Sequence, residues 1–318
     1  MARQADAIRQ LADAVLYEGY ILWPYRKSAL KNQRRFAFGG VYPPGGDDPS
    51  IMQTQCLLEG NDQARVEMTV RFLHLVERQV CRGAEPVEEL QVGEQRYLSW
   101  EEAAERELSA VMDVHSTQRL PIEIPFGSSR EALGGRGSLV RRWEAIEGGV
   151  DLRSERLRPG LFRLTVRIEN TGAADRGSRD ARTMRSTHTL LTARGGAFLS
   201  LTDPPEHLRD EAEACENIGT WPVLVGQDGG RSTLLSSPII LPDYPEIAPE
   251  SPGDLFDATE IDQMLVLNIL SLTDEEKREM RDSDPRAREI LERTERLSQD
   301  DLMRLHGAVR EFGLVRRP

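Results

Sequence analysis

The chain has 318 residues, of which 39% are hydrophobic and 30% charged, a balance typical of a globular protein. Its formal net charge is −12, so phosphate backbones and anionic lipid surfaces would repel the chain as a whole. No apolar stretch approaches the roughly 20 residues of a membrane span, and the N-terminus lacks the pattern of a secretory signal. Cys56, Cys81 and Cys215 lie far apart without a CxxC pair, which favours reduced thiols. We therefore expect a soluble, cytoplasmic protein with no membrane span and no bulk nucleic-acid binding.

The N-terminal segment predicts an amphipathic helix over about 5–20. Ile8, Leu11 and Val15 recur at intervals of three and four residues, which places them on one helical face. Trp23-Pro24 should end this helix. A basic and aromatic stretch follows, and its candidate partner-binding residues are Tyr25, Arg26, Lys31, Arg34 and Arg35.

The middle of the chain predicts mostly strands. Segments 51–60 and 64–80 have strand character, and Val66, Met68 and Val70 alternate with charged neighbours in the second. Asn61-Asp62 between the two segments predicts a hairpin. Residues 101–112, EEAAERELSAVM, predict a helix. Further predicted strands lie at 138–157, 161–172, 187–193, 197–201 and 222–226, and hairpin-linked strands of this kind favour an antiparallel sandwich.

Five prolines between 238 and 252 predict an extended crossing segment, since proline interrupts helices and central strands. The helix signals after it include Thr273 with Glu276 as a capping box and Asp284 before Pro285. The predicted fold class is therefore α+β: an antiparallel β-rich, sandwich-like domain with an N-terminal helix and a C-terminal helical unit. The predicted boundaries are 1–245 for the β-rich domain, 246–253 for the junction and 254–318 for the helical unit.

The helix predicted at 260–270 is apolar on most of its faces, so it should be buried in this chain or against a partner. Met264 and Leu267 are its candidate partner contacts. The later helix has only a narrow apolar stripe, through Ala287, Ile290 and Leu291.

Evidence for a metal site is weak. Asp254, Asp257 and Glu260 crowd a predicted helix start and could gather a cation, but acids there also offset the helix dipole, and the spaced loop of a calcium hand is absent. Cys215 could bind a metal with distant partners, although a small buried thiol is the simpler role. The five histidines show no metal-binding spacing, so we expect ordinary core or surface histidines and no cofactor.

Two short motifs have a structural and a functional interpretation. The glycine-rich run at 134–137 precedes a predicted strand and lacks the patterns of phosphate-binding loops, so it predicts a connection. The basic and aromatic stretch could stack nucleic-acid bases. Given the net charge, we favour a docking patch for an acidic protein surface or an internal ion-pair network.

Three stretches resemble an uncharacterised family encoded beside actinobacterial-type high-affinity nickel–iron hydrogenases. They are LADAVLYEGYILWPYRKSALKNQ, SSPIILPDYPEIAPESPGDLFDATEIDQMLVLNILSLTDEEKREM and DPRAREILERTERLSQDDLMRLHG. The resemblance implies an accessory, assembly or partner role towards the hydrogenase, without hydrogen chemistry in this chain, whose sequence has no paired CxxC motifs.

The leading hypothesis is thus a non-enzymatic accessory protein that presents surfaces to a protein partner, possibly hydrogenase subunits. The alternative is a metal carrier or an enzyme whose site is assembled from distant residues such as Cys215, Asp243, Glu246 and the acids at 254–262. The sequence leaves the oligomeric state open.

Overall fold

The computed structural model describes residues 2–18, 25, 38–135, 137–173, 179–226, 229–245 and 262–298. The chain divides into two compact units, the first being Met1–Tyr20 with Phe36–Glu246 and the second Ile21–Arg35 with Ile247–Pro318. The predicted junction at 246–253 lies outside the described residues. In the parts that the structure describes, no helix is long and apolar enough to cross a bilayer.

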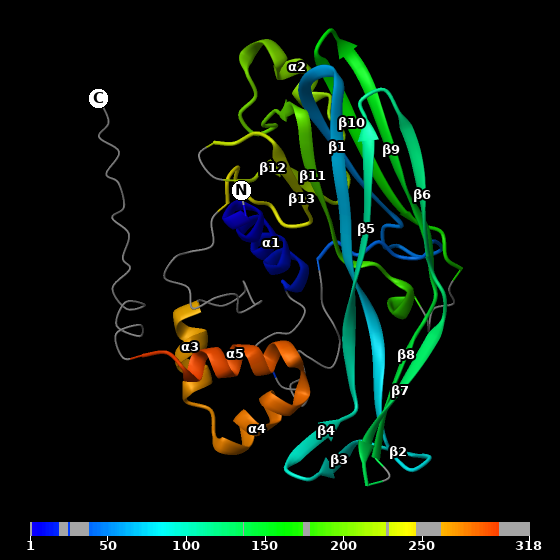
Figure 1. The fold of residues 1–318 in the computed structure, drawn as a ribbon, viewed down its shortest axis with the longest axis vertical. Coiled ribbons are helices and arrows are strands. Elements are labelled where there is room, and N and C mark those ends of the chain that lie inside the picture. Colours follow the sequence, from blue (N-terminus) through cyan, green and yellow to red (C-terminus); the bar gives the residue numbers. More distant parts are fainter. Residues whose placement is uncertain are drawn as a thin grey trace. The chain divides into compact units, whose positions relative to one another are not determined.

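The first unit is an antiparallel β-sheet structure preceded by a helix, which confirms the predicted α+β, sandwich-like class (Figure 1). Its helices are α1 (Ala2–Tyr17), η2 (Asp180–Arg182), η3 (Glu206–Leu208) and α2 (Arg209–Glu213). Its strands are β1 (Ile51–Arg82), β2 (Glu85–Val87), β3 (Glu89–Val92), β4 (Gln95–Leu98), β5 (Trp100–Asp113), β6 (Thr117–Ile124), β7 (Gly127–Gly134), β8 (Gly137–Trp143), β9 (Ile146–Arg158), β10 (Leu161–Asn170), β11 (Arg185–Phe198), β12 (Trp221–Leu224) and β13 (Thr233–Ser237). The main sheet runs β12-β13-β11-β1-β10-β9-β6, β5 and β8 pair with β1, and β7 pairs with β8.

Strand β1 is the centre of this sheet, and it bends between its two halves. Gly60 pairs with Gly196 of β11, and Arg65 pairs with Arg194, so four residues of β1 lie opposite the single Gly195. Gly195 has a φ of 75°, which favours glycine, and Figure 1 shows the chain turning over at this end of the sheet. The predicted hairpin at Asn61-Asp62 is therefore wrong: the chain turns there, but both segments belong to one strand, and both pair with β11.

The bend places both halves of β1 around one apolar core. The first half contributes Met52 and Leu58, and the second contributes the predicted alternating set, all buried. β9 and β10 add residues such as Leu152 and Phe162. Because alternate residues of a strand share a face, the alternation of apolar residues determines which side of β1 enters the core.

The helix predicted at 101–112 is wrong, because these residues form β5. β5 pairs with β1 over fourteen positions, from Trp100 opposite Arg78 to Asp113 opposite Arg65. From Glu105 onward its side chains alternate between exposed and more buried. Glutamate and alanine favour a helix locally, but pairing with a long central strand outweighs that preference.

Helix α1 packs on the sheet through the predicted apolar stripe. Ile8, Leu11 and Val15 contact residues of the strands beneath them, including Val223 and Leu235. The amphipathic N-terminal helix is thus confirmed, and it begins and ends about three residues earlier than predicted.

The second unit contains α3 (Asp262–Leu270), α4 (Asp274–Ser283) and α5 (Pro285–Glu295). The capping box of Thr273 and Glu276 is present, and the side chain of Asp284 caps α5, whose first residue is Pro285. The apolar stripe predicted through Ala287, Ile290 and Leu291 is fully buried. Tyr25 belongs to this unit, and its carbonyl oxygen accepts a hydrogen bond from the Ser283 hydroxyl at 3.3 Å.

Candidate functional site

The candidate metal ligands do not come together in the part of the chain that the structure describes. Cys215 is half-buried after α2, where its Sγ lies 3.5 Å from the carbonyl oxygen of Glu211 and it packs on a small apolar cluster. Burial raises the pKa of its thiol. Asp254, Asp257 and Glu260, as well as Glu246, lie outside the described residues. Within them, no three His, Cys, Asp or Glu side chains are grouped to hold a metal ion.

Asp243, named in the alternative hypothesis, has a structural role. Its Oδ2 accepts hydrogen bonds from the hydroxyls of Ser200 and Thr202, the latter at 2.8 Å. Its Oδ1 accepts from the backbone N–H of Leu224 at 2.8 Å. Both carboxylate oxygens therefore tie the loops after β11 and β13 to β12.

The residues predicted to contact a partner differ in their exposure to solvent. Tyr25 is fully buried and is therefore not an exposed contact, which corrects that part of the prediction. Leu267 is 43% exposed on α3, although Leu265 and Val266 beside it are buried. Met264 lies in α3, but its side chain is not among those that the structure describes. The remaining residues predicted to contact a partner, Arg26, Lys31, Arg34 and Arg35, lie outside the described residues.

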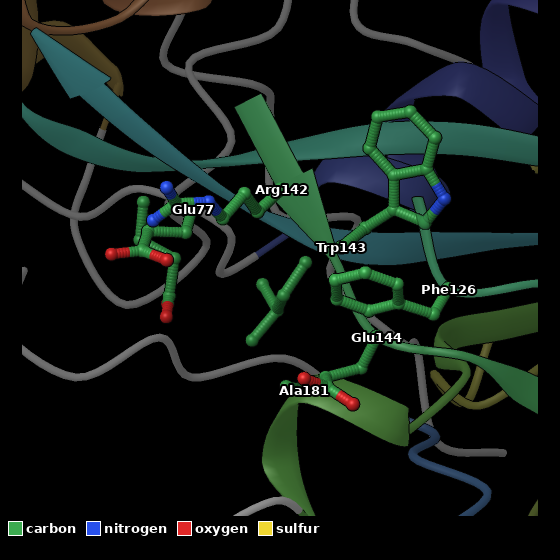
Figure 2. Close-up of a pocket in the computed structure, with 8 residues that line it drawn as sticks. Glu77, Phe126, Arg142, Trp143, Glu144 and Ala181 are labelled. Atoms are coloured by element: carbon green, nitrogen blue, oxygen red, sulfur yellow. The ribbon is translucent and has the colours of Figure 1, made fainter. Parts of the chain in front are cut away.

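A pocket of about 180 Å³ opens in the β-rich unit, at a place that the sequence did not indicate (Figure 2). It lies at the strand junction where β8 ends, next to η2. Figure 2 shows Glu77 and Arg142 on one side and Phe126 and Trp143 on the other. The lining residues are Leu75, Glu77, Glu101, Phe126, Arg142, Trp143, Glu144 and Ala181.

The pocket forms at a gap in the strand pairing along β1. One edge of β1 is paired with β5 from position 65 to 78. Its other edge pairs with β11 as far as Leu73 and with β8 only from Glu77 onward. Among the described residues, no strand pairs with positions 74–76 on that edge, and η2 lies against β1 instead. Leu75, which lies in this gap, and Ala181 of η2 both line the pocket.

Two aromatic side chains form one wall of the pocket. Phe126 is 62% exposed, so most of its ring is accessible to solvent. Trp143 is half-buried, and its Nε1 donates a hydrogen bond to the carbonyl oxygen of Pro125 at 3.1 Å. Gly127 lies opposite Trp143 in the β7–β8 pairing, and a Cβ there would come within 2.5 Å of the indole ring. Glycine at this position therefore leaves room for the tryptophan.

The charged side chains of the pocket are only partly paired. Glu144 forms an ion pair with Arg182 of η2 at 2.9 Å. Glu77 lies between Glu101 of β5 and Arg142 of β8 in the strand register. Although Glu77 and Arg142 are directly opposite, the side chain of neither forms a hydrogen bond or an ion pair with any described residue. Both are exposed, so their charges are available to a ligand.

His74 is buried next to this pocket. Its Nδ1 lies 3.4 Å from Nη2 of Arg106, and its Nε2 has no hydrogen-bond partner among the described residues. Burial, and secondarily the Arg106 charge, lower the pKa of His74 to about 4, although the backbone of Glu144 and Ala181 favours the protonated ring. The guanidinium of Arg106 also lies 6.0 Å from the centre of the Trp143 ring. A neutral histidine and an arginine thus support the aromatic wall.

A second polar cluster lies under helix α1. Arg71 of β1 is almost fully buried and contacts Asp13 of α1 at 2.7 Å and Glu105 of β5 at 3.2 Å. His188 lies opposite Arg71 on β11, and burial lowers its pKa to about 4. The hydroxyl of Tyr17 donates a hydrogen bond to Glu105 at 2.5 Å. These contacts join α1 to the sheet, so we assign the cluster a structural role.

The pocket residues were missed because they are separated in the sequence and meet only through strand pairing. Phe126, Trp143 and His74 are unremarkable in their local context, since none belongs to a motif. The side chains that line the pocket are apolar, aromatic or charged, which suits recognition through apolar contact and charge. Comparison with known protein families finds no matching family model, and comparison with curated proteins finds no significant match.

Proposed function

We propose that this protein is a non-enzymatic accessory protein that binds another protein through the pocket region of its β-rich unit. The observation that carries the proposal is the exposed ring of Phe126 beside Trp143, at the mouth of a pocket where the side chains of Glu77 and Arg142 form no hydrogen bond or ion pair with any described residue. Aromatic and arginine side chains in such recesses are typical of the residues that dominate protein–protein binding energy. Phe126, Trp143 and Arg142 provide that combination within one surface.

The edge of the sheet beside the pocket supports the same role. In the described part of the chain β7 pairs with β8 alone, and residues 128–132 are all exposed. An unpaired edge can accept an extended segment of a partner as an added strand. Arg130 and Glu131 on this strand carry charges that oppose indiscriminate pairing. A partner that binds β7 could therefore also reach Phe126, which directly precedes it.

The proposed identity of the partner rests on the sequence alone. The terminal segments resemble a family encoded beside nickel–iron hydrogenases, and on that basis we propose a hydrogenase subunit as the partner and the cytoplasm as the location. In this proposal the chain assists assembly or attachment of the hydrogenase and performs no hydrogen chemistry.

The proposal is tested by affinity capture from the native host with a crosslinker, comparing the natural chain with Phe126→Ser. The control is Val111→Ser, which alters an apolar residue that is 54% exposed on β5. We expect hydrogenase subunits with the natural chain and with Val111→Ser, and a strong loss with Phe126→Ser. Capture without any hydrogenase subunit would reject the partner, and undiminished capture by Phe126→Ser would reject the surface.

A further inference from the structure

We infer that the pocket accepts a basic side chain, an arginine or lysine, from the segment of a partner protein that binds beside β7. The inference rests on the proposed protein-binding function and names the chemistry that the pocket recognises. It follows from the charge, the rings and the size of the pocket.

The charge of the pocket favours a cation. Three carboxylates and one guanidinium line it, and the Glu144 carboxylate is already neutralised by Arg182. Glu77 and Glu101 lie directly opposite each other on adjacent strands, an arrangement of like charges that destabilises a sheet. The side chain of Glu77 has no hydrogen bond or ion pair within the described residues. A bound ammonium or guanidinium group would therefore gain an ion pair with the Glu77 carboxylate.

The aromatic wall adds a second attraction for a cation. A guanidinium or ammonium group over an aromatic face is stabilised by the ring quadrupole. The Arg106 guanidinium already lies 6.0 Å from the centre of the Trp143 ring, so this ring has a cation beside it. Phe126 is largely exposed and offers the remaining ring. The buried Leu75 provides an apolar surface for the aliphatic stem of the incoming side chain.

The size of the pocket matches one side chain. Its volume is about 180 Å³, whereas sites for cofactors and drug-sized ligands usually have volumes of about 300–1,000 Å³. A side chain carried by an extended segment needs only such a small recess, because the backbone of the segment stays outside.

The test uses two short synthetic peptides that differ only in one residue, an arginine or its uncharged analogue citrulline. Binding to the full chain is followed by NMR through the indole N–H of Trp143, which Trp143→Phe identifies among the four tryptophans. We expect the arginine peptide to shift this resonance and to bind at least about tenfold more tightly than the citrulline peptide. Raising the salt concentration should reduce the difference in affinity between the two peptides, because salt screens exposed charges.

Glu77→Gln is the matched variant, and Glu123→Gln, at an exposed position on β6, is its control. Only Glu77→Gln should lose the preference for arginine. Equal affinity for the two peptides, no binding at millimolar concentration, or an unaffected Glu77→Gln would overturn the inference. If the arginine peptide binds as expected but no hydrogenase subunit is captured, the pocket chemistry stands and the proposed partner is wrong. If capture succeeds and is insensitive to Glu77→Gln, the pocket inference is wrong and the proposed function stands.

Discussion

The guanidinium of Arg71 in β1 lies 2.7 Å from the carboxylate of Asp13 in α1, which joins the central strand to the N-terminal helix. The side chain of Arg71 is only 6% exposed, and it also contacts Glu105 of β5. One buried cation therefore connects an element at the start of the chain with two strands of the sheet. Its removal leaves several carboxylates without their common partner.

We expect Arg71→Met to destabilise the β-rich unit by about 1–3 kcal/mol, because the hydrogen bonds to a buried charge are lost. Arg65→Met is the control, since the Arg65–Asp113 pair is mostly exposed and should contribute less than about 1 kcal/mol. Urea unfolding measures both values, and hydrogen exchange shows whether the amides of α1 lose protection. If the two substitutions lowered the free energy of unfolding equally, burial of Arg71 would add nothing to the stability of the protein.

We expect the protein to lose stability as the pH falls from about 6.5 to about 4. Burial lowers the pKa values of His74 and His188 to about 4, below the value of about 6.5 of an unfolded histidine. In this window the unfolded chain binds protons at these positions and the folded chain does not, so acid favours unfolding. Above about pH 6.5 both states are neutral there and the contribution is constant. The loss is at most about 3 kcal/mol for each histidine.

This pH effect is measured by urea unfolding between pH 7 and pH 5 with His188→Gln. The variant should show a smaller slope of stability against pH than the natural chain. His207→Gln, at an exposed position, should leave the slope unchanged. If His188→Gln has the slope of the natural chain, the histidine is protonated within the fold and the prediction fails.

Helix α4 should depend on its capping box. The backbone N–H of Glu276 donates to the Thr273 hydroxyl at 3.3 Å, and the N–H of Thr273 donates to the Glu276 carboxylate at 2.9 Å. Thr273→Ala should cost about 1 kcal/mol and speed hydrogen exchange in the first turn of α4. Ser271→Ala removes only a hydroxyl bonded to the preceding helix, at Asn268, and should leave that turn protected. Unchanged exchange in Thr273→Ala would contradict the role of the cap.

The three thiols should react slowly in the folded protein. Cys56 and Cys81 are buried, and Cys215 is half-buried. Burial raises the pKa values of the Cys56 and Cys215 thiols, which lowers the fraction of reactive thiolate at neutral pH. A thiol reagent should therefore label Cys215 first and slowly, and all three only after denaturation. Cys215→Ala should remove the labelling of the folded chain, and rapid labelling of that variant would contradict the observed burial.

The sequence by itself determined the features that depend on neighbours in the chain. The stripe of α1, the alternation of Val66, Met68 and Val70, and the caps at Thr273 and Asp284 were all predicted and are present. Each is set by a periodicity or a hydrogen bond that spans only a few residues, so local sequence is sufficient to specify it.

Only the tertiary structure decided the rest. β5 has the composition of a helix and becomes a strand because β1 lies beside it along its whole length. The bend at Gly60 is recognisable only from the paired glycines of β11, far along the chain. The pocket brings Glu77, Phe126 and Trp143 together because β8 ends where it does against β1. Strand pairing and register join residues that are distant in sequence, and no local pattern records which strands will meet.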